Sequence, residues 1–147
     1  MTVDARQLLG MSQAELDELF SASPAGDIPR GDTKGTAIVA PDTHVTGMAA
    51  QVARLLAWSG KVFDPDKGDL VNTIGPLGLR RIRAKVYRGE SWLDGWECTV
   101  LDYSQTSTVA RMIRDELRQV GPGLWLGNVF WERRRVLNFA LESGAGE

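Results

Sequence analysis

The segment "VLDYSQTSTVARMIRDELRQVGPGLWLG" concentrates acids, bases and a tyrosine around Asp102 and Tyr103. A carboxylate in an apolar setting can act as a general acid or base, and a tyrosine hydroxyl can donate to a developing oxyanion. With Arg83 or Arg135 holding a carboxylate or carbonyl, this set suits cofactor-independent isomerisation, dehydration or cyclisation of a carbonyl compound. The structural alternative is that Asp102 ends its strand at the surface or pairs with an arginine.

A wider group of polar and aromatic side chains could line a ligand cavity beside this pair. Asn128 shares a strand face with Leu124 and Leu126, and a polar group buried there needs a hydrogen-bonding partner. We expect ligand contacts from the following residues: Arg83, Lys85, Tyr87, Arg114, Trp125, Asn128 and Arg135.

The sequence lacks the motifs of several common metal and cofactor sites. The segment "GDTKGT" does not have the spacing of a phosphate-binding loop, and "DPDKGD" lacks the glutamate of a calcium loop. His44 is the only histidine and Cys98 the only cysteine, so a transition-metal site would need carboxylates as its other ligands. No GxSxG nucleophile motif is present either. We therefore expect neither a metal nor a cofactor.

The composition is that of an ordinary globular protein. A chain of 147 residues with 43% hydrophobic and 24% charged residues can build one core, so we expect a single domain over residues 1–147. The net charge of −2 gives no overall attraction to nucleic acid. We interpret the basic runs at 80–85 and 133–135 as solvated strand faces.

Several features bear on cellular location. The first twenty residues contain no basic region followed by an apolar run, and no segment approaches the roughly 20 apolar residues that span a bilayer. The single cysteine excludes an intramolecular disulfide. These features favour a cytoplasmic protein without a membrane span.

Residues 1–60 have the pattern of a helical N-terminal part with one short strand. Ser12 and Glu15 form a capping-box pattern that predicts a helix over 11–23. A strand is predicted over 36–40, after a loop rich in proline and glycine. A second helix is predicted over 42–60 from the spacing of its apolar residues.

Residues 61–142 change to an alternating pattern that is typical of strands. Ile82, Ala84 and Val86 alternate with basic residues, and Asp94-Gly95 is a strong hairpin signal. Six or seven sequential strands predict an α+β protein built on an antiparallel β-barrel or half-barrel. Apolar residues at helical spacing predict one inserted helix over 107–120.

Two segments, "ARLLAWSGKVFD" and "LRRIRAKVYRG", resemble the bacterial GXWXG-type proteins of unknown function. The matching residues are Trp58, Gly60, Lys61, Phe63, Asp64, Tyr87, Arg88 and Gly89. At the position of the naming motif the chain has "GDTKGTAIV", without a tryptophan between the glycines. The resemblance covers about the middle half of the chain. It implies a lipocalin-like, or calycin, barrel with a cavity for a small hydrophobic ligand, and it implies no catalytic residue.

Three functional hypotheses follow. The first is lipocalin-like binding of a hydrophobic, anionic small molecule in a barrel cavity. The second is the cofactor-independent enzyme that uses Asp102 and Tyr103. The third is an interaction protein whose basic strands or tryptophans bind a partner or a second copy of the chain as a homodimer.

Overall fold

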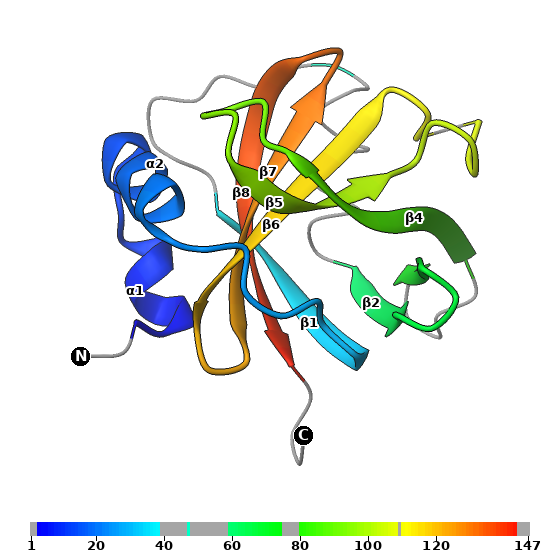
Figure 1. The fold of residues 1–147 in the computed structure, drawn as a ribbon, viewed down its shortest axis with the longest axis horizontal. Coiled ribbons are helices and arrows are strands. Elements are labelled where there is room, and N and C mark those ends of the chain that lie inside the picture. Colours follow the sequence, from blue (N-terminus) through cyan, green and yellow to red (C-terminus); the bar gives the residue numbers. More distant parts are fainter. Residues whose placement is uncertain (1–2, 39–46, 48–58, 75–79, 109, 144–147) are drawn as a thin grey trace.

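The computed structural model describes residues 3–38, 47, 59–74, 80–108 and 110–143, which form eight strands and two helices (Figure 1). The helices are α1 (Ala5–Leu9) and α2 (Gln13–Ala22). The strands are β1 (Gly31–Ile38), β2 (Gly60–Asp64), β3 (Asp69–Ile74), β4 (Arg80–Glu90), β5 (Glu97–Asp102), β6 (Ile113–Gly121), β7 (Leu124–Trp131) and β8 (Arg134–Ser143). Neither described helix is long and apolar enough to cross a membrane.

The strands close into an antiparallel barrel in sequence order. Each strand pairs with the next, and β8 returns to pair with β1. Lys34 of β1 lies opposite Gly60 of β2 on one side and Glu142 of β8 on the other. The predicted antiparallel barrel is therefore confirmed, and it is closed with eight strands rather than six or seven.

Alternation along the strands divides the side chains between an interior core and an outer surface. Leu101 on β5 and Tyr103 just after it face the interior, whereas Cys98 and Val100 belong to a second apolar cluster outside the barrel. Figure 1 shows α1 and α2 on one side of the barrel. These helices cover the outer cluster with the buried side chains of Leu8, Leu16 and Phe20.

Only part of the N-terminal prediction matches the structure. Helix α2 lies within the predicted range 11–23 and has the capping box expected from Ser12 and Glu15, whereas α1 was not predicted. The strand predicted over 36–40 begins earlier, because β1 already starts at Gly31. The predicted helix over 42–60 falls almost entirely outside the described residues, although Gly60 belongs to β2.

The predicted helix over 107–120 is wrong, because strand β6 occupies Ile113–Gly121. Ile113 and Leu117 are four residues apart, which fits one face of a helix and equally one face of a strand. The structure uses the second arrangement, with Asp115 between them on the same inner face. Pairing with β5 and β7 satisfies the backbone of β6 and overrides its helical propensity.

The interior is packed closely where Phe139 of β8 lies over Gly127 of β7. A Cβ atom on Gly127 would lie 2.3 Å from Cε1 and Cζ of the Phe139 ring. Real carbon atoms do not approach so closely, so only glycine fits beneath this ring.

We expect Gly127→Ala to lower the free energy of unfolding by about 1–3 kcal/mol, because the added methyl group displaces the Phe139 ring. Urea unfolding measures this change. Gly10→Ala is the matched control, since its nearest contact would be the Gln7 carbonyl oxygen at 3.7 Å. Equal stability of the two variants would show that the Phe139 ring moves without cost.

Candidate functional site

Four large polar side chains enter the barrel interior, which is lined mainly by apolar residues. Lys61 comes from β2, Asn72 from β3 and Asp115 from β6, while Tyr103 follows the end of β5. All four are buried, with 1% or less of their surface exposed. Strands β2 and β6 are four strands apart in a ring of eight, so Lys61 and Asp115 project from opposite walls.

Asn72 is the centre of the hydrogen-bond network. Its Oδ1 accepts from Lys61 Nζ at 2.6 Å and from Ser59 Oγ at 2.8 Å. Its Nδ2 donates to the Ile82 carbonyl at 3.0 Å and to Tyr103 Oη at 2.8 Å. Two donors on one side and two acceptors on the other fix the orientation of the amide.

The network has a direction that ends at Tyr103. Lys61 donates to Asn72, and Asn72 donates to the Tyr103 hydroxyl oxygen. Each donation polarises the next donor in such a chain. No described residue accepts the proton of the Tyr103 hydroxyl. That proton is therefore a strengthened donor inside the barrel.

Asp115 supplies the complementary acceptor. Its Oδ1 is buried and has no hydrogen-bond partner among the described residues. Burial raises the pKa of Asp115 to about 7; the Lys61 charge lowers this pKa in part and Glu116 adds to the rise. The carboxyl group therefore changes its protonation state near neutral pH.

Lys61 lies above an aromatic ring as well as beside Asn72. Its Nζ is 5.4 Å from the centroid of the Phe139 ring, a distance at which a ring face attracts a cation. Burial lowers the pKa of Lys61 to about 8, and the charge of Asp115 opposes part of this change. Lys61 and Asp115 do not form a direct ion pair within 4.0 Å.

The predicted catalytic pair is not brought together. Tyr103 faces the interior, but Asp102 lies on the outer face of β5. There Asp102 accepts hydrogen bonds from Tyr87 Oη at 2.7 Å and from Ser104 Oγ at 2.6 Å. Burial alone would raise the pKa of Asp102, but the bonds from Ser104 and Tyr87 hold it below its usual value. Consecutive residues of an extended chain face opposite ways, so Asp102 and Tyr103 do not face the same side of the barrel wall.

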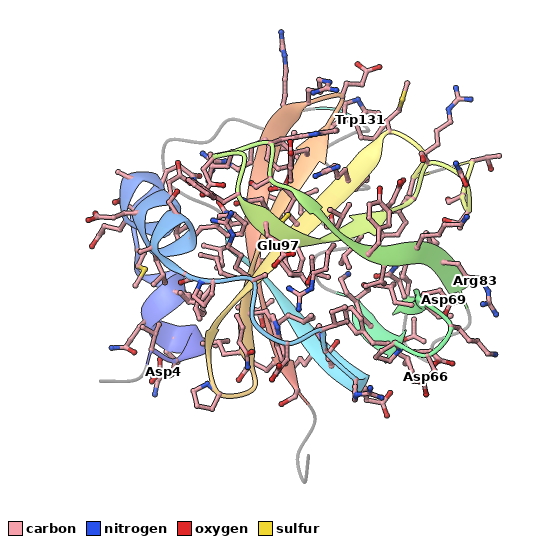
Figure 2. The ribbon with its side chains drawn as sticks, in the orientation of Figure 1. Asp4, Asp66, Asp69, Arg83, Glu97 and Trp131 are labelled. Carbon is pink, nitrogen blue, oxygen red and sulfur yellow. The ribbon has the colours of Figure 1, made fainter. Side chains whose placement is uncertain are left out.

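Most predicted ligand-binding side chains also lie outside the barrel. Figure 2 shows Arg83 at the outer surface near Asp69, with which it forms a 3.6 Å ion pair. Lys85 is exposed and donates to Gln105. Tyr87 is exposed as well, and bonds Asp102. These three side chains therefore lie on the outer surface and not in the barrel interior.

The remaining predicted residues fall into two groups. Arg114 pairs with Glu116, Arg135 with Asp17 of α2, and Asn128 with Asn138, all on the outer face. Each of the three has a protein side chain as a partner, although Asn128 Nδ2 has no hydrogen-bond partner among the described residues. Among the predicted ligand-binding residues, Trp125 alone lies in the interior core.

Trp125 lines a cleft of about 530 Å³ at one end of the barrel. Its indole nitrogen donates to the Asp27 carbonyl at 2.8 Å, which fastens the segment before β1 across this end. Arg30 and Arg88 also line the cleft. This end therefore offers positive charge next to an aromatic wall.

Three of the four interior polar residues had no place in the predicted site. Lys61 lies two residues before Phe63 in "KVF", and Asn72 lies two residues from both Leu70 and Ile74 in "LVNTI". Because residues two apart in a strand share a face, both polar residues lie on the inner face with these apolar neighbours. Alternation could have identified both. Asp115 could not be found in that way, because its segment was assigned to a helix.

Comparison with protein-family models, with curated proteins and with solved structures gave no match. Within the described residues, no group of three or more histidine, cysteine or acidic side chains could hold a metal ion.

The two interior charges give opposite pH dependences of stability. We expect the free energy of unfolding to fall as pH rises from 3.8 to about 7, because unfolded Asp115 releases its proton near 3.8 and the folded state keeps it until about 7. Between about 8 and 10.5 stability rises again, because unfolded Lys61 retains its proton longer than folded Lys61.

Urea unfolding across both intervals measures this profile. Asp115→Asn removes the decline on the acidic side, whereas Asp102→Asn keeps it, since the lowered pKa of Asp102 acts only below its usual value of 3.8. A decline that survives in Asp115→Asn would show that another group causes it.

Proposed function

We propose that the chain binds a small molecule inside the barrel, with an apolar body and a carbonyl or carboxylate oxygen. The observation that carries the proposal is that, among the described residues, neither the Tyr103 hydroxyl proton nor Asp115 Oδ1 has a hydrogen-bonding partner. A ligand oxygen fits the first, and a hydroxyl or acidic C–H group fits the second.

The energetic argument supports a ligand site over a purely structural role. A buried charge costs several kcal/mol unless it is paired closely, and apolar residues of similar volume usually stabilise such a position better. Asp115 lies in the interior, and its Oδ1 has no hydrogen-bond partner among the described residues. Selection for stability alone does not explain this carboxyl group in the core.

The surroundings define the rest of the ligand. Leu101 and Val129 lie beside Asp115 in the register, and Leu117 follows on the same inner face. These aliphatic walls suit a hydrophobic body. Lys61 polarises the Tyr103 hydroxyl through the hydrogen bonds of Asn72. A donor strengthened in this way favours an anionic or strongly polar oxygen as the head group of the ligand.

A lipocalin-like architecture is part of this proposal. Its support is the sequential antiparallel order of eight strands, the arrangement in which small barrels hold one ligand. The segment that resembles the GXWXG-type proteins includes Lys61, which the structure buries in the interior.

Decanoate tests the proposal, with decyltrimethylammonium as a probe of equal chain length and opposite charge. We expect calorimetry to detect decanoate binding and no binding of the cationic probe. Lys61→Met should weaken decanoate binding at least about tenfold, because Lys61 strengthens the Tyr103 donor through Asn72 and a hydrogen bond to a charged head group is worth roughly 1.5–3 kcal/mol.

Lys85→Met is the matched control, since Lys85 is exposed on the outer face. This variant should bind decanoate like the wild type. Lys61→Met should also remain folded, because methionine fills the same volume without a buried charge. Equal affinity of both probes for the wild type would contradict the proposed head-group recognition.

A further inference from the structure

We propose that the same interior catalyses proton transfer next to a carbonyl group, with Asp115 as the base and Tyr103 as the oxyanion donor. The substrate class is an unsaturated ketone or aldehyde whose double bond migrates into conjugation. This inference rests on the proposed binding of a carbonyl compound in the barrel, and it adds a reaction to that binding.

The position of Asp115 suits a base. Its Oδ1 has no hydrogen-bond partner in the part of the chain that the structure describes, so no described side chain engages the lone pairs that would take a proton. Apolar side chains flank it in the register, Leu101 on β5 and Val129 on β7. Desolvation of a carboxylate in such surroundings increases its basicity.

The position of Tyr103 suits stabilisation of an oxyanion. Its oxygen already accepts from Asn72 Nδ2, so its proton is the part of the hydroxyl that can serve a ligand. Lys61 and Asn72 act as positioning residues, because their hydrogen bonds orient and polarise the hydroxyl without any need to contact the substrate. Preorganised donors of this kind often make the largest contribution to catalysis.

The reaction balances without a co-reactant. Asp115 Oδ1 removes a proton from the carbon between the carbonyl group and the double bond of a β,γ-unsaturated ketone. The C–H electron pair forms a carbon–carbon double bond, and the carbonyl π pair moves to the oxygen, which Tyr103 stabilises. Asp115 then returns the proton to the γ carbon, where the electron pair of the β,γ double bond forms the new C–H bond. The enolate carbon–carbon pair moves to the α,β position, and an electron pair on oxygen re-forms the carbonyl group of the conjugated product.

The charges around Asp115 set the pH range of this chemistry. Lys61 faces it from the opposite wall, Tyr103 lies in the same interior, and Glu116 is its neighbour on β6. With its pKa raised to about 7, Asp115 is a stronger base than an exposed aspartate and is still substantially ionised at neutral pH.

The test is conversion of cyclohex-3-en-1-one to cyclohex-2-en-1-one, followed by ultraviolet absorbance. We expect the wild type to exceed the buffer rate. Asp115→Asn should lower kcat/KM at least about 100-fold, and Tyr103→Phe about 10- to 100-fold. Asp102→Asn and Tyr87→Phe are matched controls on the outer face of the same wall, and both should retain the wild-type rate.

The pH profile separates the base from its positioning residues. The value of kcat/KM should rise with pH through about 7 as Asp115 ionises, and fall above about 8 as Lys61 loses its charge. Lys61→Met should remove the alkaline fall and keep the acidic rise. A lysine with only a structural role would leave the shape of the profile unchanged.

Several results would overturn the assignment. Decanoate binding without turnover of the ketone by the wild type contradicts catalysis and leaves the binding proposal intact, whereas loss of both contradicts both. Loss of turnover in Asp102→Asn would place the base outside the barrel. If Asp115→Asn does not fold, Asp115→Glu provides the test, because it keeps the carboxylate and should lower kcat while preserving the acidic rise.

Discussion

Closure of the sheet is the constraint on which the other features depend. Because β1 pairs with both β2 and β8, the described sheet has no free edge strand, and each strand must direct alternate side chains inward. Lys61 cannot turn outward unless Phe63, its neighbour on the same face of β2, also leaves the core. The barrel therefore holds polar residues in its interior that an open sheet could expose to water.

On the outer face of the barrel, the buried charged side chains of Arg118 and Glu116 are closely paired. Arg118 is almost fully buried, and it bonds Asp94 through two nitrogens while donating to the Phe20 carbonyl. Glu116 accepts from Ser91 Oγ and from the Trp92 backbone nitrogen, and pairs with Arg114. Each of these groups has close, directional partners. Asp115, one residue from Glu116, has an oxygen without any partner among the described residues, and this contrast sets the interior site apart.

The sequence predicted the architecture better than the site, for a physical reason. Period-two alternation on β4 and β5 is visible in the residues themselves, so the face sets of Ala84 and Val100 could be predicted. The spacing between Ile113 and Leu117 fits a helix and a strand equally, and only the pairing of β6 with β5 and β7 decides between them. Because the segment was predicted as a helix, Asp115 was not expected in the interior, and Asp102 was predicted as the acidic site residue. In the structure the Asp102 carboxylate is hydrogen-bonded on the outer surface.

The separation between Lys61 and Asp115 is the feature that gives the interior its chemistry. A direct ion pair would lower the pKa of Asp115 and engage both charges with each other. Instead, Lys61 donates a hydrogen bond to Asn72, and Asn72 donates one to the Tyr103 hydroxyl, which polarises that hydroxyl. Asp115 lies on the opposite wall of the barrel. One side of the interior thus strengthens a proton donor, and the other keeps a proton acceptor available. In a carbonyl compound the oxygen and the acidic carbon lie close together. The Tyr103 hydroxyl can therefore donate to the oxygen while the Asp115 carboxylate accepts a proton from the carbon.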